Sequence, residues 1–382
     1  MRVLINGLSM GGGGGLTVGR HLTESLAAAH PDWRIELEVT AQNPLHEELD
    51  GVVFPANASV RKAPRDTQGR RARSAYERGP LAARAEADGV DVVLQLNGMV
   101  VAGMKPPTVS HFQDPWPYRR EAWGRPLDRW VAVLKRRAHR YALRRCAAAT
   151  WTSSYLEQLI CGHAGRTPAI SEVVYNGVPD NWLDRPESEC LDWAERPRIL
   201  TTVSNVTEYK RQSLVIRSLG KLHERGELRD VEYRVGGQGT PAVMDGLRTL
   251  AEECGVGDRV FLEGRISDER VRELFRTSRV FVLMSVCESF GIPAVEAMTF
   301  ATPVVVADCC AIPEVCGDAG AVVPVDDVNA LADRLLAVFE SEAEARAMGT
   351  RGRTRAQQFS WRAVAERMGG VLERAAVVRA KG

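Results

Sequence analysis

The feature that most constrains this 382-residue chain is a repeated alternation of short apolar runs with helical stretches. The runs are rich in Val, Ile and Leu without strict alternation, which is typical of strands covered by helices on both faces of a parallel sheet. They form two series, at Arg2–Asn6, Ile35–Thr40, Val90–Leu96, Thr108–Phe112, Ala148–Ser153 and Val173–Asn176, and then at Ile199–Ser204, Val231–Gly236, Val260–Leu262, Val280–Met284, Val304–Ala307 and Ala321–Pro324. Helical stretches lie between many of them, for example Leu16–Ala29, Gln212–Glu224, Pro241–Cys254 and Asp268–Ser278. The pattern therefore predicts an α/β protein with two Rossmann-like, doubly wound parallel sheets.

The two series are separated by a polar segment near Asp184–Pro197, in which two prolines, Pro186 and Pro197, occur. A chain of this length is too long for a single core, so we place the domain boundary in this segment, with a first domain at 1–185 and a second from 186 onward. Ligands of open parallel sheets bind at the carboxyl ends of the strands, and two facing sheets make a cleft. We therefore expect the function to lie in the loops that follow the strands.

Composition excludes several classes of protein. The formal net charge is only +1, which disfavours a protein built to hold nucleic acid. The N-terminus lacks the apolar stretch of a signal peptide, and no later run approaches the roughly 18 apolar residues of a membrane span. The eight cysteines are scattered apart from Cys309-Cys310, with no pair of Cys-x-x-Cys motifs for zinc. We expect a cytoplasmic protein with reduced thiols; the sequence indicates no oligomeric state.

A glycine run, Met10–Gly15, follows the first strand and leads into a helix. Glycines such as Gly12, Gly13 and Gly14 let a backbone approach a ligand closely, and the helix N-terminus offers unpaired N–H groups. Contact with a diphosphate or an acceptor is one interpretation, and a flexible turn is the other. The spacing does not fit the G-x-G-x-x-G dinucleotide fingerprint, which disfavours an NAD-linked oxidoreductase.

The segment Ser285–Met298 follows the strand Val280–Met284 and carries two acids, Glu288 and Glu296. Pro293 suits the first turn of a helix, so the preceding loop can point N–H groups at an anion. Two carboxylates are poor phosphate ligands but good acceptors for the hydroxyls of a sugar and a ribose. Solvated surface acids are the alternative, which leaves the neighbouring Phe-Gly and Pro without a reason.

The segment Glu288–Glu296 matches the Glu-x7-Glu signature of retaining glycosyltransferases of the GT-B fold, and the chain resembles glycosyltransferase family 4. The likeness extends over most of the chain, through the glycine run, Asn176–Val178, Tyr209–Arg211, Gly236–Gly239, Gly264–Ser267, Thr302–Val305, Ile312–Val315 and Phe359–Trp361. The resemblance implies that a nucleotide-sugar donor binds to the second domain, 186–360. It also implies that residues 361–382, helical from Trp361 to about Val378, cross back to the first domain.

The resemblance assigns roles by position. Glu288 would accept hydrogen bonds from the donor sugar, Glu296 would hold the ribose, and Lys210 would neutralise the departing diphosphate. The remaining donor-binding positions are the backbone of Phe290, Gly291 and Ile292 at the diphosphate, Arg265 and Ile266 at the base, and Gly237 at the rim of the nucleotide site.

One position departs from the family pattern. Many members have an Arg five residues before the lysine, where this chain has Asn205. An amide carries no charge, so stabilisation of the leaving group is reduced unless Arg211 or a first-domain group compensates. We expect the chain to tolerate Asn205 as a donor-binding residue, because the other matched positions are intact.

The first domain offers His111, Gln113 and Asp114 just past a predicted strand. Family members often have His-Asp here, with the His facing the donor sugar. Alignment on Asp114 puts Gln113 at the histidine position and His111 two residues earlier. We expect His111 to be the catalytic contributor, with Gln113 the alternative and Asp114 beside it on the acceptor side.

Two stretches are basic. Arg119–Arg145 interleaves basic residues with apolar ones at roughly helical spacing, namely Trp123, Leu127, Trp130, Leu134 and Tyr141. Peripheral contact with anionic lipid is one interpretation. The other, which we favour, is a helix with its apolar face on the sheet and a solvated basic face. For Arg61–Arg78 we expect a loop and a helix near the acceptor.

The resemblance implies transfer with retention through a loose, oxocarbenium-like transition state, since no residue occupies an obvious nucleophile arrangement. No Asp-x-Asp motif follows a strand, so we expect neither a metal ion nor a cofactor beyond the co-substrate. UDP is the first choice of donor nucleotide and GDP the second. The acceptor would be an envelope glycan, a lipid-linked sugar or a small molecule of the aminocyclitol type. An epimerase or hydrolase on the same scaffold, and a non-catalytic nucleotide-sugar-binding protein, remain alternatives.

Overall fold

A computed structural model describes residues 1–10, 14–40, 49, 52–64, 67, 69–186 and 190–378. They form two compact units. The first unit comprises Met1–Tyr118, Leu127–Gly177 and Trp361–Gly382, and the second comprises Arg119–Pro126 and Val178–Ser360. The sequence placed the boundary at 185, whereas the first unit ends at Gly177 and one short segment, Arg119–Pro126, belongs to the second unit.

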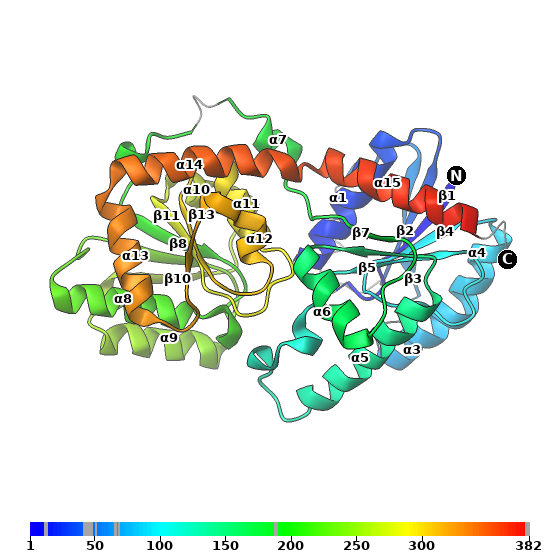
Figure 1. Cartoon of the computed structure of the whole chain (residues 1–382), viewed down its shortest axis with the longest axis horizontal. Helices are drawn as coiled ribbons and strands as arrows, with labels where there is room; N and C mark the ends of the chain where they lie inside the picture. Colours follow the sequence, from blue (N-terminus) through cyan, green and yellow to red (C-terminus); the bar gives the residue numbers. More distant parts are fainter. Residues whose placement is uncertain are drawn as a thin grey trace. The chain divides into compact units, whose positions relative to one another are not determined.

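The described residues of the first unit contain a seven-stranded parallel sheet in the order β3-β2-β1-β4-β5-β6-β7 (Figure 1). The strands are β1 (Arg2–Asn6), β2 (Arg34–Thr40), β3 (Ala58–Ala63), β4 (Val92–Gln95), β5 (Thr108–Phe112), β6 (Ala148–Trp151) and β7 (Ser171–Val173). The helices are α1 (Gly14–Ala29), α3 (Arg70–Tyr76), the π-helical turn η2 (Glu77–Leu81), α4 (Ala82–Ala87), the 3₁₀ turn η3 (Trp116–Tyr118), α5 (Asp128–Arg145), α6 (Ser154–Ala164) and α15 (Trp361–Val378). The central strands β4 and β5 are buried along their whole length, as their apolar runs predict.

The described residues of the second unit contain a six-stranded parallel sheet in the order β10-β9-β8-β11-β12-β13. The strands are β8 (Ile199–Val203), β9 (Glu232–Gly236), β10 (Val260–Gly264), β11 (Val280–Leu283), β12 (Val304–Ala307) and β13 (Gly320–Val323). The helices are α7 (Asp180–Leu183), α8 (Gln212–Arg225), α9 (Pro241–Glu253), α10 (Asp268–Thr277), α11 (Ile292–Thr299), α12 (Ile312–Cys316), α13 (Val328–Glu340) and α14 (Glu342–Ala356), with the 3₁₀ turns η4 (Arg120–Ala122), η6 (Trp193–Glu195), η7 (Glu208–Lys210), η8 (Gly257–Arg259), η9 (Gly317–Ala319) and η10 (Gln357–Phe359). One layer contains α8, α9 and α13, and α11 packs with α14 in the other (Figure 1). The predicted pair of doubly wound parallel sheets is confirmed.

One strand was missed by the sequence analysis. Residues from Arg61 onward were expected in a loop and a helix, but Arg61 and Lys62 lie in the edge strand β3, which pairs with β2. Ala58 and Val60 of this strand are half-buried, whereas its charged residues Arg61 and Lys62 are exposed. An edge strand needs no continuous apolar run, so the Val-rich pattern that identified the central strands could not identify this one.

The last helix, α15, belongs to the first unit and packs against α1. Its buried side chains recur at helical spacing, and the indole of Trp361 stacks on His21 of α1 with the ring centroids 5.5 Å apart. A side chain at Gly177 would collide with that indole, which explains the glycine there. The chain thus passes through the second unit and contributes its final helix to the first.

Helix α5 differs from the interpretation that we favoured. Its buried residues are Ala132, His139, Ala142 and Leu143. The large apolar residues that were expected to face the sheet, Trp130, Leu134 and Tyr141, are exposed. That expectation was wrong because small residues allow the helix to approach its neighbours closely, and the bulky ones are therefore not needed for burial.

Candidate functional site

The topological switch point of the second unit lies between β8 and β11. Both strands run parallel with Leu200 opposite Val280, so the loops that follow them leave the same edge of the sheet side by side. In this strand order, chain connections leave in opposite directions from these two strands, and the crevice between them is the usual ligand site of a doubly wound sheet. The second unit therefore has its natural binding position at the ends of β8 and β11.

The two loops at this position are joined through their backbones. After β8 the chain forms the turn η7, and the carbonyl of Tyr209 accepts a hydrogen bond of 2.9 Å from the amide of Val286 in the loop after β11. This link aligns Lys210 with Glu288, and the Lys210 ammonium forms an ion pair with Oε1 of Glu288. Two of the sequence-predicted residues, 78 positions apart in the chain, are thus brought into direct contact.

The environment of Lys210 favours its charged form. The side chains of Lys210 and Glu288 are only 13% and 14% exposed. Burial alone would lower the pKa of Lys210, but the carboxylate of Glu288 outweighs burial, and the net pKa lies above its usual range. The site therefore contains a nearly buried ammonium whose charged form is favoured and which is already paired with a carboxylate.

Helix α11 begins immediately beside this pair. Gly291 is its N-cap residue and adopts φ 89°, a left-handed conformation that favours glycine, and Pro293 lies in the first turn. No side chain caps this N-terminus, so its first N–H groups have no intrahelical acceptor. The preceding Phe290 is buried and packs edge-on against Phe359, and this contact holds the loop that precedes α11 in place. An anion placed here would meet N–H donors and the positive end of the helix.

Glu296 lies one turn further along α11. It is half-buried, and burial, followed by the nearby charge of Asp268, raises the pKa of its carboxyl to about 7. Within the described part of the chain its side chain forms no hydrogen bond or ion pair. A carboxyl without a protein partner in such a position is suited to accept hydrogen bonds from hydroxyls of a ligand.

The ends of β9 and β10 form a second closely packed corner. Gly237 has φ 151°, its amide donates to the carbonyl of Gly264, and a Cβ on it would lie 1.7 Å from the carbonyl oxygen of Ser204. The side chain of Ile266 lies against Gly236, where a Cβ would come within 2.3 Å of it. The predicted residues Gly237 and Ile266 thus lie together at the same edge of the sheet.

The remaining predicted donor residues are more exposed. Asn205 and Arg265 both have exposed side chains. Arg211, which we considered as a replacement for the missing arginine, has φ 57° and forms an ion pair of 2.9 Å with Asp326. Its guanidinium would have to leave that carboxylate before it could reach a diphosphate.

The first-unit candidates have structural contacts of their own. His111 is 2% exposed, its Nδ1 lies 2.9 Å from the hydroxyl of Thr150, and burial lowers the pKa of its imidazole to about 4. Gln113 donates to the carbonyl of Leu96, and Asp114 pairs with Lys135 at 2.7 Å. Their roles in catalysis stay predictions. Gly12 and Gly13 lie outside the described residues, while Gly14 is the first residue of α1.

Sequence reasoning missed a residue that supports the Glu288 loop. Arg119 donates from Nε to the carbonyl of Val286 at 3.1 Å and from Nη2 to the sulfur of Cys309 at 3.1 Å. It belongs to the short segment Arg119–Pro126 that joins the second unit. Its position in a long basic stretch, 167 residues before Val286, gave no signal of this contact.

The end of β1 holds a second missed pair. The amide of Asn6 donates to Glu77 at 3.0 Å, and burial raises the pKa of the Glu77 carboxyl. Because Glu77 comes from the π-helical turn η2, 71 residues away, no local motif predicts this pair.

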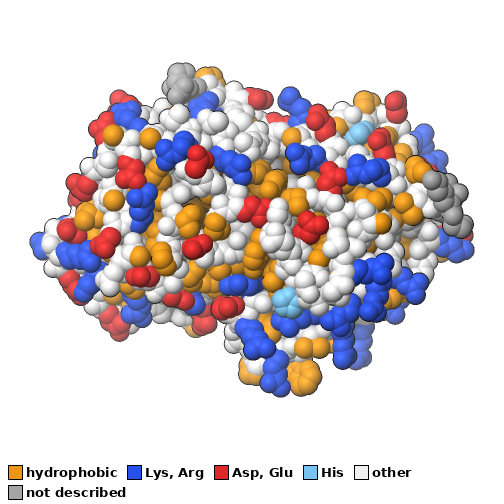
Figure 2. All heavy atoms as spheres, viewed as in Figure 1, with side chains coloured by type: hydrophobic (Ala, Val, Ile, Leu, Met, Phe, Trp, Pro, Cys, Tyr) orange, Lys and Arg blue, Asp and Glu red, His pale blue; other side chains and the backbone are white. Residues whose placement is uncertain are grey.

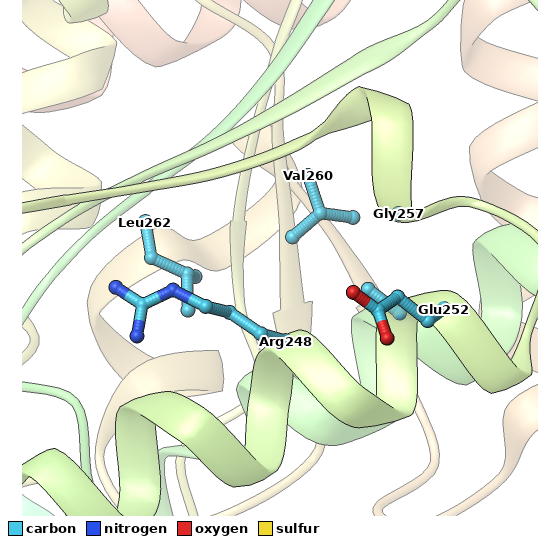
Figure 3. A pocket seen from close by; sticks show the side chains of 6 residues that line it. Arg248, Glu252, Gly257, Val260 and Leu262 are labelled. Carbon is cyan, nitrogen blue, oxygen red and sulfur yellow. The ribbon is translucent and has the colours of Figure 1, made fainter.

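A small hollow of about 180 Å³ is lined by residues of α9 and β10 (Figure 3). The side chains of Val260 and Leu262 face Arg248 and Glu252 across it. Val260 is the first residue of β10, so this hollow lies toward the amino ends of the strands, away from the loops that carry Lys210 and Glu288. It is not part of the candidate site.

Among the described residues, no group of three or more His, Cys, Asp and Glu side chains is arranged to hold a metal ion. None of their helices combines the length and the apolar character that crossing a bilayer requires.

Comparison with known proteins gives matches to two family models. Residues 185–355 match the model described as glycosyl transferases group 1, which covers Lys210, Glu288 and Glu296. Residues 12–182 match the model described as glycosyltransferase family 4. The two matches divide the chain close to the boundary between the two units.

Curated relatives share part of the chain. The chain is 34% identical over 187 residues to the MMP alpha-(1->4)-mannosyltransferase of Mycolicibacterium hassiacum, covering 47% of this chain and 44% of the relative. It is 38% identical over 98 residues to the O-antigen chain mannosyltransferase B of Escherichia coli, 26% of each chain. It is 28% identical over 221 residues to the D-inositol 3-phosphate glycosyltransferase of Corynebacterium efficiens, covering 56% of this chain and 52% of the relative. These matches span from a quarter to about half of the relatives' own lengths.

Solved structures share the whole fold. The sucrose-phosphate synthase of Thermosynechococcus elongatus superposes with a TM-score of 0.79 at 18% identity, covering 99% of this chain and all of the other. HepE of Anabaena in complex with UDP-glucose superposes with a TM-score of 0.75 at 20% identity, covering 98% and 99%. At such identities the likeness establishes the fold alone.

Proposed function

Because this chain belongs to the GT-B glycosyltransferases described by the group 1 and family 4 models, we propose that it is a retaining enzyme using a nucleoside diphosphate sugar. It would transfer the sugar to a hydroxyl group of a sugar-like or small-molecule acceptor. The observation that carries the proposal is the Lys210–Glu288 pair at the switch point of the second unit, beside the uncapped N-terminus of α11.

The diphosphate would bind between the Lys210 ammonium and the N-terminus of α11. Both supply positive potential in a position that is largely shielded from water, so charge that develops on the leaving group is stabilised without rearrangement. This arrangement supports a reaction that needs neither a divalent cation nor a resident cofactor.

Donor binding would exchange the partner of Lys210, from the carboxylate of Glu288 to the diphosphate of the donor. In the structure the ammonium of Lys210 has the carboxylate of Glu288 as its partner. A diphosphate carries more negative charge than one carboxylate and would compete for the same ammonium. Glu288 would then be free to accept hydrogen bonds from the hydroxyls of the donor sugar and hold the anomeric carbon in place.

Glu296 and the β9–β10 corner would bind the nucleoside. The unpartnered carboxyl of Glu296 suits the two hydroxyls of a ribose, and Ile266 with Gly236 offers a closely packed rim for the base. UDP is the first candidate nucleotide and GDP the second. HepE of Anabaena was solved with UDP-glucose, and the two first relatives carry mannosyltransferase in their names.

Retention at the anomeric carbon would follow from positioning. Both carboxyls of the site are assigned to binding, Glu288 to the hydroxyls of the donor sugar and Glu296 to the ribose, so neither is assigned as a nucleophile. The acceptor hydroxyl would therefore attack from the face that the diphosphate leaves, through a loose transition state with positive charge on the sugar.

The test begins with donors. The purified full chain is titrated by calorimetry with UDP, GDP, UDP-glucose and GDP-mannose, and the donor that binds is then incubated with acceptors that include inositol 3-phosphate and mannosides. We expect a product whose anomeric configuration equals that of the donor, measured from the coupling constant of its anomeric proton. An inverted product would refute retention. Donor turnover to an epimer or to free sugar at the same rate without acceptor would show an epimerase or hydrolase instead, and binding without turnover would indicate a sensor.

A further inference from the structure

Helix α5 has an apolar stripe that the fold leaves uncovered. Leu127 just before the helix, and Trp130, Leu134 and Tyr141 within it, are 71%, 59%, 63% and 42% exposed. Their spacing of three, four and seven residues places them along one face of a helix, opposite the face that buries His139 and Ala142. Four of the nine large hydrophobic side chains that are exposed among the described residues lie on this one stripe. Scattered exposed hydrophobics are ordinary, whereas a cluster of this kind marks an interaction surface.

Arginines surround the stripe. The exposed arginines of α5 are Arg129, Arg137, Arg140, Arg144 and Arg145. Among the described residues, none of these five forms an ion pair, and Asp128 is the single acidic residue of the helix. Two of the guanidinium groups lie over aromatic rings of the stripe, Arg129 over Trp130 at 5.2 Å and Arg145 over Tyr141 at 5.9 Å. Figure 2 shows blue and orange spheres next to one another at the lower edge of the view, over this helix.

The other basic residues of α5 are already occupied. Lys135 forms an ion pair with Asp114, and Arg136 donates to the carbonyl of Pro117. These side chains anchor the helix to its own unit. Of the five exposed arginines only Arg140 forms a hydrogen bond of this kind, a long one of 3.4 Å to the carbonyl of His163, and none of the five pairs with a carboxylate among the described residues, so their charge is available to a partner.

We infer that the exposed face of α5, formed by Leu127, Trp130, Leu134, Tyr141 and the five exposed arginines, docks on an anionic lipid bilayer. The helix would lie in the plane of the interface. Its aromatic and leucine side chains would enter the boundary between headgroups and acyl chains, to a depth of roughly 5–10 Å, while the arginines pair with lipid phosphates. A solvated basic helix needs no exposed tryptophan and leucine, and an apolar protein contact would not place five arginines without ion pairs around the apolar stripe. The inference does not rest on the proposed catalytic function.

The experiment measures binding to vesicles. The full chain is sedimented with vesicles of phosphatidylglycerol and phosphatidylcholine in a one-to-two ratio, and with vesicles of phosphatidylcholine alone. We expect binding to the anionic vesicles, little binding to the neutral ones, and loss of binding in 1 M salt, where the screening length falls to about 3 Å. The double variant Arg137→Gln/Arg144→Gln should bind roughly 30-fold more weakly, since each arginine near the surface contributes roughly fivefold. The double variant Trp130→Ser/Leu134→Ser should lose at least about tenfold.

Matched controls lie in the second unit. Arg272 and Arg276 are exposed arginines of α10, and Arg272→Gln/Arg276→Gln removes the same charge elsewhere. Val322 is an exposed apolar residue of β13, and Val322→Ser removes apolar surface elsewhere. Both controls should bind like the unaltered chain, and circular dichroism checks that every variant is folded. Because all substitutions are on exposed side chains, little loss of stability is expected.

A second measurement tests insertion of the stripe. Brominated lipids quench tryptophan at close range, so quenching of the unaltered chain should exceed that of Trp130→Phe, which keeps an apolar ring but removes the indole. Equal quenching in the two proteins would overturn the inference. So would equal binding to anionic and neutral vesicles, unchanged binding of the α5 variants, or a failure to bind vesicles while the face binds RNA or holds two copies of the chain together.

Discussion

Replacement of either member of the Lys210–Glu288 ion pair separates the two roles that we propose for these residues. Lys210→Ala removes the ammonium that would stabilise charge on the departing diphosphate. Turnover should fall by roughly 10²–10³, the size of one lost electrostatic group. Affinity for the free nucleoside diphosphate should fall by roughly 10–100-fold, because one hydrogen bond between charged groups is lost.

Glu288→Gln should act differently. Turnover should fall because the donor sugar loses an ionised acceptor, but diphosphate affinity should not fall, since Lys210 loses its competing partner. With the two side chains 13% and 14% exposed, the unpaired ammonium is largely but not fully cut off from water. The free energy of unfolding should therefore drop by about 1–3 kcal/mol. That corresponds to a fall in the melting temperature of about 3–8 °C, which nucleoside diphosphate should partly restore.

The assay combines calorimetry with the diphosphate, transfer rates and thermal unfolding. Lys221 and Glu224 provide the matched control, because they form an exposed lysine–glutamate pair at 2.9 Å on α8. Lys221→Ala should leave turnover and affinity unchanged and shift the free energy of unfolding by less than about 0.5 kcal/mol. Equal loss of diphosphate affinity in Lys210→Ala and Glu288→Gln would refute the assignment of the two roles.

Four further outcomes are expected. Activity should survive EDTA in the assay buffer; complete loss that Mg²⁺ or Mn²⁺ restores would contradict a metal-independent site. Since burial raises the pKa of Glu296 from 4.5 to about 7, its protonated form stabilises the fold, and that contribution should be lost as the pH rises through this window. If ribose binding needs the ionised form, affinity for an intact nucleotide sugar should rise about tenfold between about pH 6 and pH 8 and stay flat in Glu296→Gln. Gly237→Ala should disrupt the second unit, because its Cβ would lie 1.7 Å from a carbonyl oxygen. The control Gly246→Ala has nothing within 4 Å of its Cβ and should be neutral or stabilise α9 by about 0.5–1 kcal/mol. Similar melting temperatures of the two variants would contradict this expectation. Truncation before Trp361 should remove α15 from α1 and lower the stability of the first unit in a denaturant titration, and an unchanged transition would show that the helix is dispensable.

The sequence by itself determined the architecture, two doubly wound parallel sheets, and it placed the two acids of the candidate site. The expected bounds of β1, β5 and β12 agree with the structure, because these strands are buried almost along their whole length and lack the polar-apolar alternation of a half-exposed strand. The acids Glu288 and Glu296 were predicted from their loop and helix context, which is local in the chain. Gly291 and Pro293 mark the start of α11 for the same reason, since the backbone conformation there depends on these residue types.

Only the tertiary structure decided contacts between distant segments. The ion pair of Lys210 with Glu288, the support of the Glu288 loop by Arg119, and the pairing of Arg211 with Asp326 each depend on which strands are neighbours and on how the loops close. The exposed face of α5 was also beyond the sequence. Its periodicity gives an apolar stripe, but whether that stripe is buried depends on the elements packed around the helix, and here the small residues Ala132 and Ala142 fill the contact instead.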